Sequence, residues 1–572
     1  MARSALFSQL GRVASQLFEA SARASRARIP NAAPAVTRRQ LFRASVGLGL
    51  SACAAQSGTV QKTGGPASHR VAVIGAGLAG LHCAFRLAQA GVDVTVYEAN
   101  TRLGGRAFTG RTLFGDSSSK LIAELGGEFI ASDHTVMHAL AREFGILLDE
   151  RLPSAAGGVS EVYWLSGKEI PAQTVTEQLA AVTPALFAAL AAADGDASVF
   201  RDLDNTTLAS FFEQNVPSLK FPELSALLGV AFRVEFGLEP DQQSALNVLY
   251  LVGPGQQRGL NSSNSGSLFH AHSGNDTFTT QLSIPLLDRI KRNRRLLSIA
   301  PKPDSGGVDS SPTFTLSFET ETASGFVAEA EHVVFALPFS ILRGLELSAL
   351  TLSAEKRKLI AQLGYGTHSK LLGAFRTRIW RDQLRSGSVS SDLPFQQVWD
   401  SSVGQTESQA PVTQGILSNL QGGHAGAKAD SALVSASMAA LLSDLNNVFP
   451  GVSAAYLAGS AVRMHWPSST FSRGSAACYR PGQWALRGNE GVREGNLYFC
   501  GEHCSIDFQG RMEGAVETGA LVAAKILDDL ELPLPVALSE LVEPKLVVPQ
   551  PCYDGTTGAA LGFLGRRKKL AI

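Results

Sequence analysis

The clearest pattern of apolar and polar positions lies between residues 70 and 98. Val71–Ile74 is a continuous apolar run, as expected for a strand that is buried on both faces of a parallel sheet. Leu81–Ala90 then spaces its apolar residues with the period of an amphipathic helix, and Val92–Tyr97 forms a second strand-like run. The pattern predicts a strand–helix–strand unit, which is typical of α/β domains with a parallel sheet.

Three glycines occupy the turn between the first strand and the helix. Gly75, Gly77 and Gly80 have the spacing G-x-G-x-x-G, which combines a tight turn, close approach of backbone to a pyrophosphate, and close helix–strand packing. The N-terminus of the helix would face the phosphates. Glu98 ends the second strand, where an acid can bond a ribose hydroxyl and disfavours a 2′-phosphate. The stretch therefore predicts a dinucleotide-binding site.

The rest of the chain alternates between helical and strand-like patterns. Residues 173–250 contain several Ala/Leu-rich helical segments, whereas residues 383–430 are polar and predict irregular surface structure. Ile284–Arg292 predicts a helix, and Arg294–Ile299 predicts an edge strand. These patterns predict a largely helical region after the strand–helix–strand unit.

Composition and charge exclude several classes of function. The chain has 572 residues, enough for two or three domains. Its formal net charge is zero, but residues 1–52 hold eight arginines and one acid, so the remainder carries 42 basic and 49 acidic residues. Such an acidic body is a poor surface for nucleic acid, and no nucleic-acid partner is expected. The six cysteines do not suggest a disulfide scaffold, and Cys500 and Cys504 lack a second ligand pair, so no metal is expected.

The N-terminal residues 1–53 are predicted to be a targeting segment. Thr37–Arg43 resembles a twin-arginine export motif, and Ala44–Ala55 is an apolar segment too short to span a bilayer. Leu50–Cys53 resembles a lipobox, in which Cys53 would become the lipid-carrying N-terminus. We expect export to the periplasm, with possible membrane attachment through a lipid on Cys53. An organellar transit peptide rich in arginine and serine is the alternative.

Two motifs resemble the signatures of a known family. Glu98–Arg106 has the spacing E-A-x-x-R-x-G-G-R, and Asn496–Leu527 is similar to Y-F-A-G-E/T-x…G-x-M-E-G-A-V-x-S/T-G. Both are signatures of the flavin-containing amine oxidase superfamily, and the resemblance covers residues 70–530. It implies that FAD is the cofactor. It also implies a set of cofactor-binding residues: Gly75, Gly77, Ala79, Gly80, Glu98, Arg102, Gly104, Gly105, Arg106, Gly126, Gly127, Leu296, Gly501, Glu502 and Met512.

The resemblance also implies roles for individual cofactor-binding residues. In the family, the second glycine pair brings backbone to the FAD pyrophosphate, and the arginine after it, here Arg106, helps to neutralise the charge. Glu502 would bond the ribityl or pyrophosphate region. The predicted helix Gly510–Ile526 would direct its N-terminus at the flavin and stabilise charge on the reduced form.

Two further positions are matched by local resemblance. Gly126 and Gly127 lie in an E-L-G-G element that the family places close to the flavin ring, where small residues let backbone approach. Glu128 follows them and faces either the substrate cavity or solvent. Leu296 matches, by its position on the predicted edge strand, a residue whose backbone contacts adenine.

Lys370 is the predicted catalytic residue. It lies in an otherwise apolar strand after Gly364, and this strand resembles the one that carries the family's active-site lysine. That lysine holds a water against flavin N5. The alternative for Lys370 is a lysine at a strand end, with its stem buried and its ammonium in water.

Three residues are predicted to contact the substrate: Tyr479, Phe508 and Arg511. Met464–Trp484 is similar to the family's W-x-x-x-x-F/Y-x-x-G segment, and it includes Cys478 followed by Tyr479. In monoamine oxidases a cysteine before a tyrosine is joined to the flavin, so Cys478 is either a covalent attachment site or a buried free thiol. Phe508 replaces the usual tryptophan. Arg511 stands where an aromatic residue is common, and it would pair with a substrate carboxylate or turn to solvent.

The resemblance implies an α/β flavoprotein with a Rossmann-like FAD-binding domain and an α+β substrate-binding domain. The FAD-binding domain would comprise residues 69–130, 273–345 and 474–530. The substrate domain would comprise a helical part, residues 131–272, and a second part, residues 346–473. The targeting segment (1–53), a linker (54–68) and a C-terminal tail (531–572) are the expected remaining parts.

The implied activity is oxidation of an amine. Hydride transfer from the carbon that bears nitrogen to the flavin gives an imine, and O₂ reoxidises the flavin to give H₂O₂. The partners would be a small-molecule amine or amino acid and O₂, and the oligomeric state stays open. The alternatives are an L-amino-acid oxidase, suggested by Arg511, a C–C desaturase or oxidase of the same fold, and a non-catalytic FAD-binding module. Lys370 and the complete closing motif argue against the last.

Overall fold

The computed structural model describes Leu10, Gly11 and Ala14 together with residues 70–111, 121–150, 161–252, 268–302, 313–319, 325–405 and 413–542. The twin-arginine-like motif, the lipobox-like Cys53, the linker and residues 543–572 of the tail lie outside these described residues. Export, lipid attachment and the organellar alternative therefore stay predictions.

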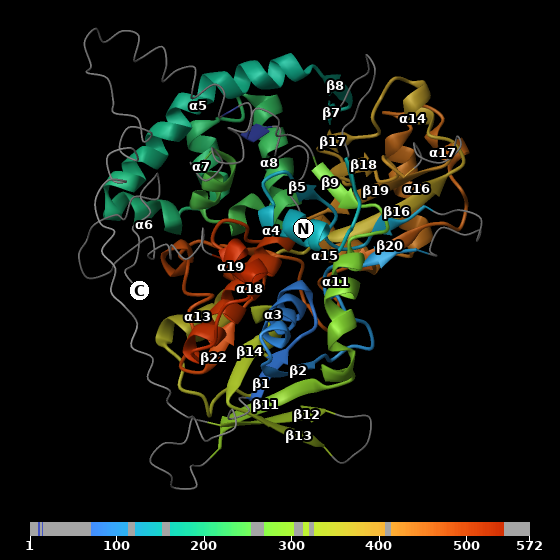
Figure 1. Ribbon diagram of the computed structural model, residues 1–572. Coiled ribbons are helices and arrows are strands. Elements are labelled where there is room, and N and C mark those ends of the chain that lie inside the picture. Colours follow the sequence, from blue (N-terminus) through green and yellow to red (C-terminus); the bar gives the residue numbers. More distant parts are fainter. Residues whose placement is uncertain are drawn as a thin grey trace, which may run out of the picture.

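A five-stranded parallel sheet forms the centre of one half of the molecule (Figure 1). Its strands come from three stretches that are far apart in the sequence, so this half is discontinuous. In spatial order they are β10 (Ile290–Lys291), β2 (Asp93–Tyr97), β1 (Arg70–Ile74), β14 (His332–Phe335) and β22 (Leu497–Phe499).

Both faces of this sheet are covered. Val73 of β1 packs with helices α3 (Leu78–Gln89) and α18 (Met512–Asp529) on one face. Ile74, the next residue, packs on the other face, toward an antiparallel sheet. Burial on both faces explains why β1 is a continuous apolar run in the sequence.

The antiparallel sheet on the second face has three strands, β11 (Arg295–Pro301), β12 (Phe314–Glu319) and β13 (Phe326–Ala330). The ring of Tyr97, at the end of β2, stacks on Phe318 with 4.4 Å between ring centroids. The predicted edge strand Arg294–Ile299 corresponds to β11, which is an edge strand of this sheet.

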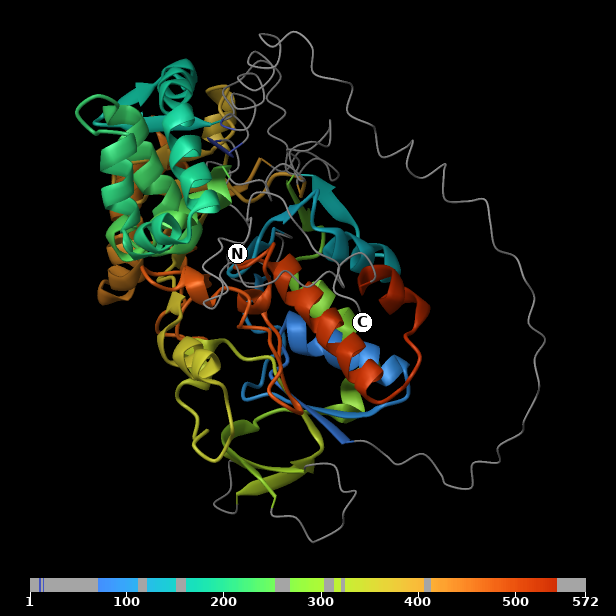
Figure 2. The same cartoon turned by 90° about the vertical axis from the view of Figure 1, so that its left-hand side faces the viewer.

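Helices α3 and α18 lie side by side over the parallel sheet (Figures 1 and 2). Their contact is close because Gly519 of α18 faces Ala79 of α3, where a side chain would collide with the Ala79 carbonyl oxygen. Helix α4 (Thr135–Glu143) packs on α18, and the Glu513 carboxylate accepts hydrogen bonds of 2.9 Å from the N–H groups of Val136 and Met137. Helix α4 thus belongs with this half, although the predicted boundary at residue 131 assigns it to the substrate domain.

The other half contains a seven-stranded mixed sheet, in which β17 and β7 form the parallel pair and the other neighbouring strands are antiparallel. In spatial order the strands are β20 (Val462–His465), β16 (Ser369–Phe375), β19 (Gly415–Gln421), β18 (Gln397–Asp400), β17 (Val389–Ser391), β7 (Val162–Leu165) and β8 (Lys168–Ile170).

Helices α5 to α9 pack beside this sheet and form the end of the molecule opposite β11–β13 (Figure 1). By length and composition α5 could span a membrane, but one of its faces packs into the core, as in a core helix. Their bounds are α5 (Ala172–Gly195), α6 (Ala197–Asn205), α7 (Leu208–Asn215), α8 (Pro222–Phe236) and α9 (Leu249–Val252).

Shorter elements complete the fold. The small sheets are formed by β3 (Thr109–Gly110), β4 (Ala123–Glu124), β5 (Ile130–Ala131), β6 (Leu148–Glu150), β9 (Leu268–Ala271), β15 (Gly364–Tyr365) and β21 (Ala477–Cys478). The remaining helices are α11 (Asp276–Ser283), α12 (Phe339–Leu342), α13 (Ala354–Gln362), α14 (Ile379–Asp382), α15 (Gly423–Lys428), α16 (Val434–Leu445), α17 (Val452–Ala455) and α19 (Val536–Val542).

Two predictions of local structure are wrong. Ile284–Arg292 is not an α-helix: a short 3₁₀ segment, Ile284–Arg289, leads into β10, because Ile290 and Lys291 pair with the edge strand β2. Within residues 383–430, the described part contains β17, β18, β19 and α15 instead of irregular surface. Its polar residues are satisfied inside the sheet; Asn419, for example, donates a 2.8 Å hydrogen bond to the Gln397 carbonyl.

Candidate active site

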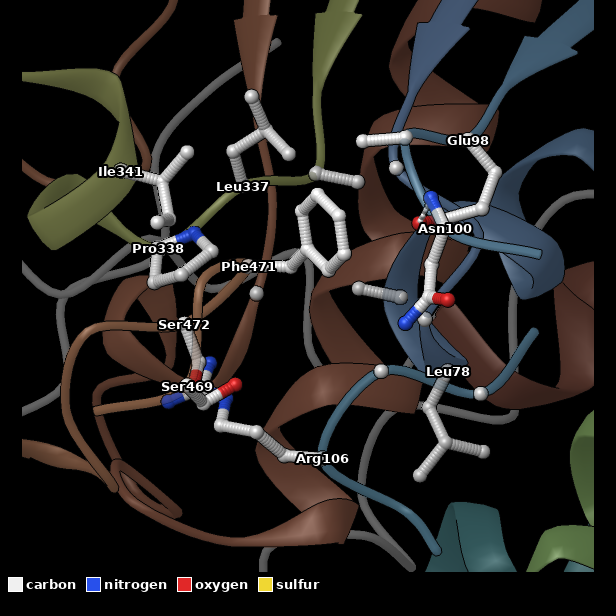
Figure 3. Close-up of a pocket in the computed structure, with 18 of the residues that line it drawn as sticks. Leu78, Glu98, Asn100, Arg106, Leu337, Pro338, Ile341, Ser469, Phe471 and Ser472 are labelled. Carbon is white, nitrogen blue, oxygen red and sulfur yellow. Dashed lines mark hydrogen bonds between the residues drawn. The ribbon is translucent and has the colours of Figure 1, made fainter. Parts of the chain in front are cut away.

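A cavity opens at the C-terminal edge of the parallel sheet, between β1, β2, the N-termini of α3 and α18, and the segment 466–475 (Figure 3). Figure 3 shows Glu98, Asn100 and Leu78 on one side and Leu337 and Phe471 on the other. Most of the predicted cofactor-binding residues line it: Gly75, Gly77, Ala79, Glu98, Arg102, Gly104, Gly105, Arg106, Gly126, Gly127, Leu296, Gly501, Glu502 and Met512.

The glycine turn after β1 brings backbone to this cavity. A side chain at Gly80 would collide with the carbonyl oxygen of Gly75, so glycine is required there for α3 to approach β1. Gly80 itself does not line the cavity. At Gly77, by contrast, a Cβ would meet no protein atom within 4 Å. The turn therefore keeps an open face, toward which the first N–H groups of α3 are directed.

The carboxylate of Glu98 lines the cavity beside this turn. It accepts hydrogen bonds from the N–H groups of Ala76, at 2.7 Å, and Asn100, at 2.8 Å. Burial raises the pKa of Glu98 above its usual value. Each carboxylate oxygen can accept a further hydrogen bond, as a ribose hydroxyl would require.

The two arginines of the second glycine motif have different surroundings. Arg102 holds the glycine loop together, because its guanidinium donates to the carbonyl oxygens of Leu103 at 2.9 Å and Gly105 at 2.7 Å. Arg106 reaches the closing motif and pairs with Glu502 at 2.8 Å. Burial acts to raise the pKa of Glu502, but the charge and hydrogen bond of Arg106, together with the neighbouring His503, hold it below the usual value. The Arg106–Glu502 pair thus joins two motifs that are almost 400 residues apart.

Helix α18 directs its N-terminus at the cavity. Its N-cap residue, Arg511, provides no side-chain cap, and Arg511 and Met512 both line the cavity. The guanidinium of Arg511 lies 3.7 Å from the Glu235 carboxylate, and both side chains are more than nine-tenths buried. Nε of Arg511 is buried without a hydrogen-bond partner among the described residues.

Lys370 lies directly behind the cavity wall. It belongs to β16, and its Nζ donates to the carbonyl oxygens of Glu124 at 2.8 Å and Gly126 at 3.0 Å and to the Glu128 carboxylate at 2.9 Å. The side chain of Lys370 is 2% exposed, so its ammonium does not extend into water as the alternative for Lys370 would require. Gly126 lines the cavity, so one peptide group separates the lysine from it.

Glu128 faces neither solvent nor the open cavity. Its side chain is 4% exposed, and its second oxygen accepts hydrogen bonds from Trp399 Nε1 at 2.8 Å and Ser401 Oγ at 3.0 Å. Glu124 lies beside it and accepts from Thr109 Oγ1 at 2.9 Å. Burial raises the pKa of Glu124 to about 8, so this carboxyl carries a proton at neutral pH.

Two of the predicted substrate contacts lie away from the cavity. Tyr479 is buried in the core, and its hydroxyl donates to Glu490 at 2.8 Å. Phe508 packs edge-on against His134 and is not among the lining residues. Cys478 is a buried free thiol in β21, paired with Gly364 of β15, so it lies in the core and not in the cavity wall. Burial raises the pKa of this thiol.

Segment 466–475 supplies lining residues that the site prediction does not include. Trp466, Phe471 and Ser475 all face the cavity, and Trp466 Nε1 donates to the Leu125 carbonyl at 3.2 Å. The sequence signal for them is the W-x-x-x-x-F-x-x-G spacing from Trp466 to Gly474. Pro338 and Ile341, which follow β14, line the same side.

Comparison with known proteins decides the family. The model of the flavin containing amine oxidoreductase family matches residues 78–527. The chain belongs to this family. AofH of Mycobacterium tuberculosis, named provisionally as a flavin-containing monoamine oxidase, is 26% identical over 480 residues, which cover 80% of this chain and 96% of AofH. The flavin-dependent L-tryptophan oxidase RebO of Lentzea aerocolonigenes is 25% identical over 502 residues, which cover 80% of this chain and 98% of RebO.

A solved structure has the same fold. Cyclohexylamine oxidase from Brevibacterium oxydans superposes with a TM-score of 0.67 at 21% identity, covering 81% of this chain and 100% of the oxidase. The protein thus has the two-domain fold of the flavin amine oxidases, with an FAD-binding and a substrate-binding domain. It is an FAD-dependent oxidoreductase, and FAD is its cofactor.

The cavity of this flavin amine oxidase fits FAD at two places. The open face of Gly77 leaves room for a pyrophosphate against the N-terminus of α3. Helix α18 lacks a side-chain cap where it meets the cavity, so its first N–H groups are open to a ligand. An elongated anion would supply partners at these positions.

Proposed function

We propose that the protein oxidises an amine by hydride transfer from the carbon that bears nitrogen, giving an imine that water hydrolyses. The observation that carries the proposal is a single cavity that is lined both by the dinucleotide turn and by Gly126, Gly127 and the N-terminus of α18, with Lys370 buried behind its wall. Bound FAD supplies the hydride acceptor and passes the electrons to O₂, which becomes H₂O₂.

The side chains of this chain would hold the cofactor along that cavity. Gly77 and the N-terminus of α3 would take the pyrophosphate, and Glu98 the ribose hydroxyls. Arg106, fixed by Glu502, would add positive charge near the phosphates. The uncapped N-terminus of α18 would stabilise negative charge at the reacting end.

The proposed chemistry predicts a rate that rises with pH. Hydride leaves the substrate carbon when the neighbouring nitrogen holds its lone pair, so the amine must be in its neutral form. The rate constant of flavin reduction by a simple amine should therefore increase as pH approaches the pKa of that amine. Stopped-flow absorbance under anaerobic conditions measures it, and a flat profile would contradict the proposed step.

A second candidate, oxidation of L-amino acids, is favoured by Arg511. A guanidinium can bind a carboxylate with two parallel hydrogen bonds, and Arg511 lines the cavity with a buried Nε that lacks a partner within the described structure. Its neighbour Glu235, at 3.7 Å, would compete for the same guanidinium. The relative RebO is named as an L-tryptophan oxidase, which supports amino acids as a candidate substrate class.

The deciding experiment mixes the full-length protein with primary amines, polyamines and L-amino acids in turn and follows flavin absorbance without oxygen. Loss of absorbance with amines alone supports the first candidate. Loss with amino acids alone supports the second, and Arg511→Gln should then raise KM for amino acids at least tenfold, about 1.4 kcal/mol of lost binding. Bound FAD that none of these compounds reduces would contradict both and favour C–C oxidation or a non-catalytic role.

We also propose that the protein is exported by the twin-arginine route and is lipidated at Cys53, with the organellar transit peptide as the competing possibility. The support is the Thr37–Arg43 motif and the short apolar segment after it. Cell fractionation of the wild-type protein and of a variant with Arg38→Lys and Arg39→Lys tests export. Retention of this variant in the cytoplasm, with Cys53→Ser released from membranes, is the expected outcome.

A further inference from the structure

All three N–H donors of a Lys370 ammonium are taken by protein acceptors. They go to the carbonyl oxygens of Glu124 and Gly126 and to one oxygen of the Glu128 carboxylate, at distances of 2.8 to 3.0 Å. A lysine ammonium has three donors and no acceptor. Lys370 in this arrangement has no N–H group left for a water molecule or a ligand.

The Glu128 carboxylate is itself fixed by the substrate domain. Trp399 Nε1 and Ser401 Oγ donate to the oxygen that does not face Lys370. The centroid of the Trp399 ring lies 5.4 Å from Lys370 Nζ. The ion pair is thus enclosed by groups from β16, β18 and the segment after β4, and its two side chains are 2% and 4% exposed.

The ion pair lies against the reacting end of the cavity. Gly126 and Gly127 line the cavity, and the Gly126 carbonyl is one of the three acceptors of Lys370. The effective dielectric of a protein interior is lower than that of water, so buried charges interact more strongly there. An unbalanced ammonium behind this wall would therefore stabilise the reduced, negatively charged flavin. Its counter-ion therefore decides how much of that charge the flavin experiences.

We propose that Glu128 is the positioning residue and counter-ion of Lys370: it fixes the ammonium behind the Gly126–Gly127 wall and cancels most of its charge at the flavin. This rests on the proposed function, since it takes that wall to face the flavin ring. Glu128 acts through Lys370, and it is not assigned a contact with substrate.

The other titratable groups around the pair do not replace Glu128 at neutral pH. Glu124 approaches Lys370 from β4, and burial raises its pKa to about 8, so it is protonated. His368, which directly precedes β16, is fully buried, and burial lowers its pKa to about 3, so it is neutral. The charge balance at pH 7 is therefore between Lys370 and Glu128.

The test uses the full-length FAD-loaded protein and needs no substrate. The wild type is compared with Glu128→Gln, the charge-preserving Glu128→Asp, Lys370→Met and the double variant Glu128→Gln/Lys370→Met. Two quantities are measured between pH 6 and pH 9: the reduction potential of the bound flavin, and the rate constant of its reoxidation by O₂ after photoreduction.

Glu128→Gln should leave the ammonium unbalanced and stabilise reduced flavin about tenfold, which for two electrons is a rise of about 30 mV in the potential. The rise should be largest at pH 6. It should shrink as pH increases toward 9, because Glu124 then ionises and its negative charge balances the excess positive charge. Reoxidation by O₂ should accelerate severalfold, whereas Glu128→Asp should stay near the wild type.

Lys370→Met gives an independent test if Glu128→Gln does not fold. With the cation gone, the buried carboxylate of Glu128 should take up a proton, so the net charge beside the flavin should not change. The equilibrium constant for flavin reduction should therefore stay within twofold of the wild-type value. A large fall in potential would show that the Lys370 charge is not balanced in the wild type. An unchanged potential in Glu128→Gln at pH 6, or a rise that persists in the double variant, would also overturn the proposal.

Failure of the proposed function itself has a different signature. A wild-type protein that binds no FAD would defeat both proposals before any potential is measured. Bound FAD that amines and amino acids do not reduce would defeat the proposed substrate classes, yet the potentials of the Glu128 and Lys370 variants would still decide the role of this ion pair.

Discussion

Lys370 and Lys356 are both buried lysines, but their surroundings differ. Lys370 touches the wall of the FAD cavity through Gly126. Lys356 donates to the carbonyl oxygens of Asn489 and Glu490, and its ammonium lies 3.9 Å from the ring centroid of Phe499. Burial lowers the pKa of Lys356 to about 8. Lys356 is therefore a control for Lys370: substitution of either removes a buried lysine, but only Lys370 contacts the wall of the FAD cavity.

Lys370→Met should slow flavin reduction by substrate, or flavin reoxidation, at least tenfold, about 1.4 kcal/mol in the activation free energy. FAD should stay bound. The reason is that the carbonyl groups of Glu124 and Gly126 lose their shared donor, so the cavity wall is no longer fixed. Stopped-flow absorbance measures both half-reactions. Lys356→Met, the control, should lower stability without this loss of rate, and equal rates in wild type and Lys370→Met would remove Lys370 from the mechanism.

Glu124 should give stability a pH dependence of known sign. Its folded-state pKa is raised to about 8 from the usual 4.5, so the folded protein binds more protons than the unfolded chain between these values. Its contribution to stability is complete below pH 4.5 and is lost as pH rises through 8. Glu124→Gln removes this group, so its thermal midpoint should increase relative to that of the wild type from pH 5 to pH 8. A constant difference would contradict the assignment.

At the scale of elements, two glycines of one motif have different roles: Gly80, within α3, serves packing, and Gly77, its N-cap, serves cofactor binding. A Cβ at Gly80 would collide with the Gly75 backbone, so Gly80→Ala forces α3 away from β1. A Cβ at Gly77 would meet no protein atom, and this residue has φ −80°, which any residue adopts. Gly80 is therefore required by the fold, and Gly77 by the ligand that occupies the cavity.

Gly80→Ala should therefore lower the free energy of unfolding even without FAD, by ~1–3 kcal/mol, as for other overpacked sites. Gly77→Ala should leave the stability of the FAD-free protein unchanged or slightly higher, but weaken FAD binding at least tenfold, about 1.4 kcal/mol. Thermal unfolding of the FAD-free proteins and FAD titration by fluorescence measure the two effects. Equal FAD affinities in Gly77→Ala and wild type would place the pyrophosphate elsewhere.

The molecule as a whole assembles one site from segments far apart in the chain. Arg106 and Glu502 connect the glycine motif to the closing motif, and Lys370 of the substrate sheet reaches the Gly126 wall. Because a ligand in this cavity contacts both halves, its binding should stabilise them together.

The whole described fold should therefore unfold in one thermal transition, and removal of FAD should lower its midpoint temperature. It should not lower the midpoint of only one of two separate transitions. At free FAD a hundred times Kd, binding contributes about 2.7 kcal/mol of stability. Differential scanning calorimetry with and without FAD measures this change. Two transitions, of which FAD moves one, would show that the halves unfold independently and that the cavity belongs to one of them.

The sequence by itself determined the parts of the protein whose chemistry is local. The strand–turn–helix from Arg70 to Gln89 follows from an apolar run and the glycine spacing, and the structure places β1 and α3 there. Glu98–Arg106 and the closing motif pointed to FAD and to the family in the same way, because contiguous backbone and side chains bind the phosphates.

Tertiary structure decided everything that depends on partners distant in sequence. Residues 383–430 look like surface in the sequence, but their described part forms central strands. The polar side chains find partners inside the sheet, as when Asn419 donates to the Gln397 carbonyl. By residue type Cys478 matches a cysteine that is joined to the flavin, and Tyr479 is predicted to contact substrate. Both lie in the core instead, because β21 pairs with β15 and the Tyr479 hydroxyl donates to Glu490. Glu128 becomes the partner of Lys370, 242 residues away, because the fold places the segment between β4 and β5 against β16, and neither sequence pattern contains this contact.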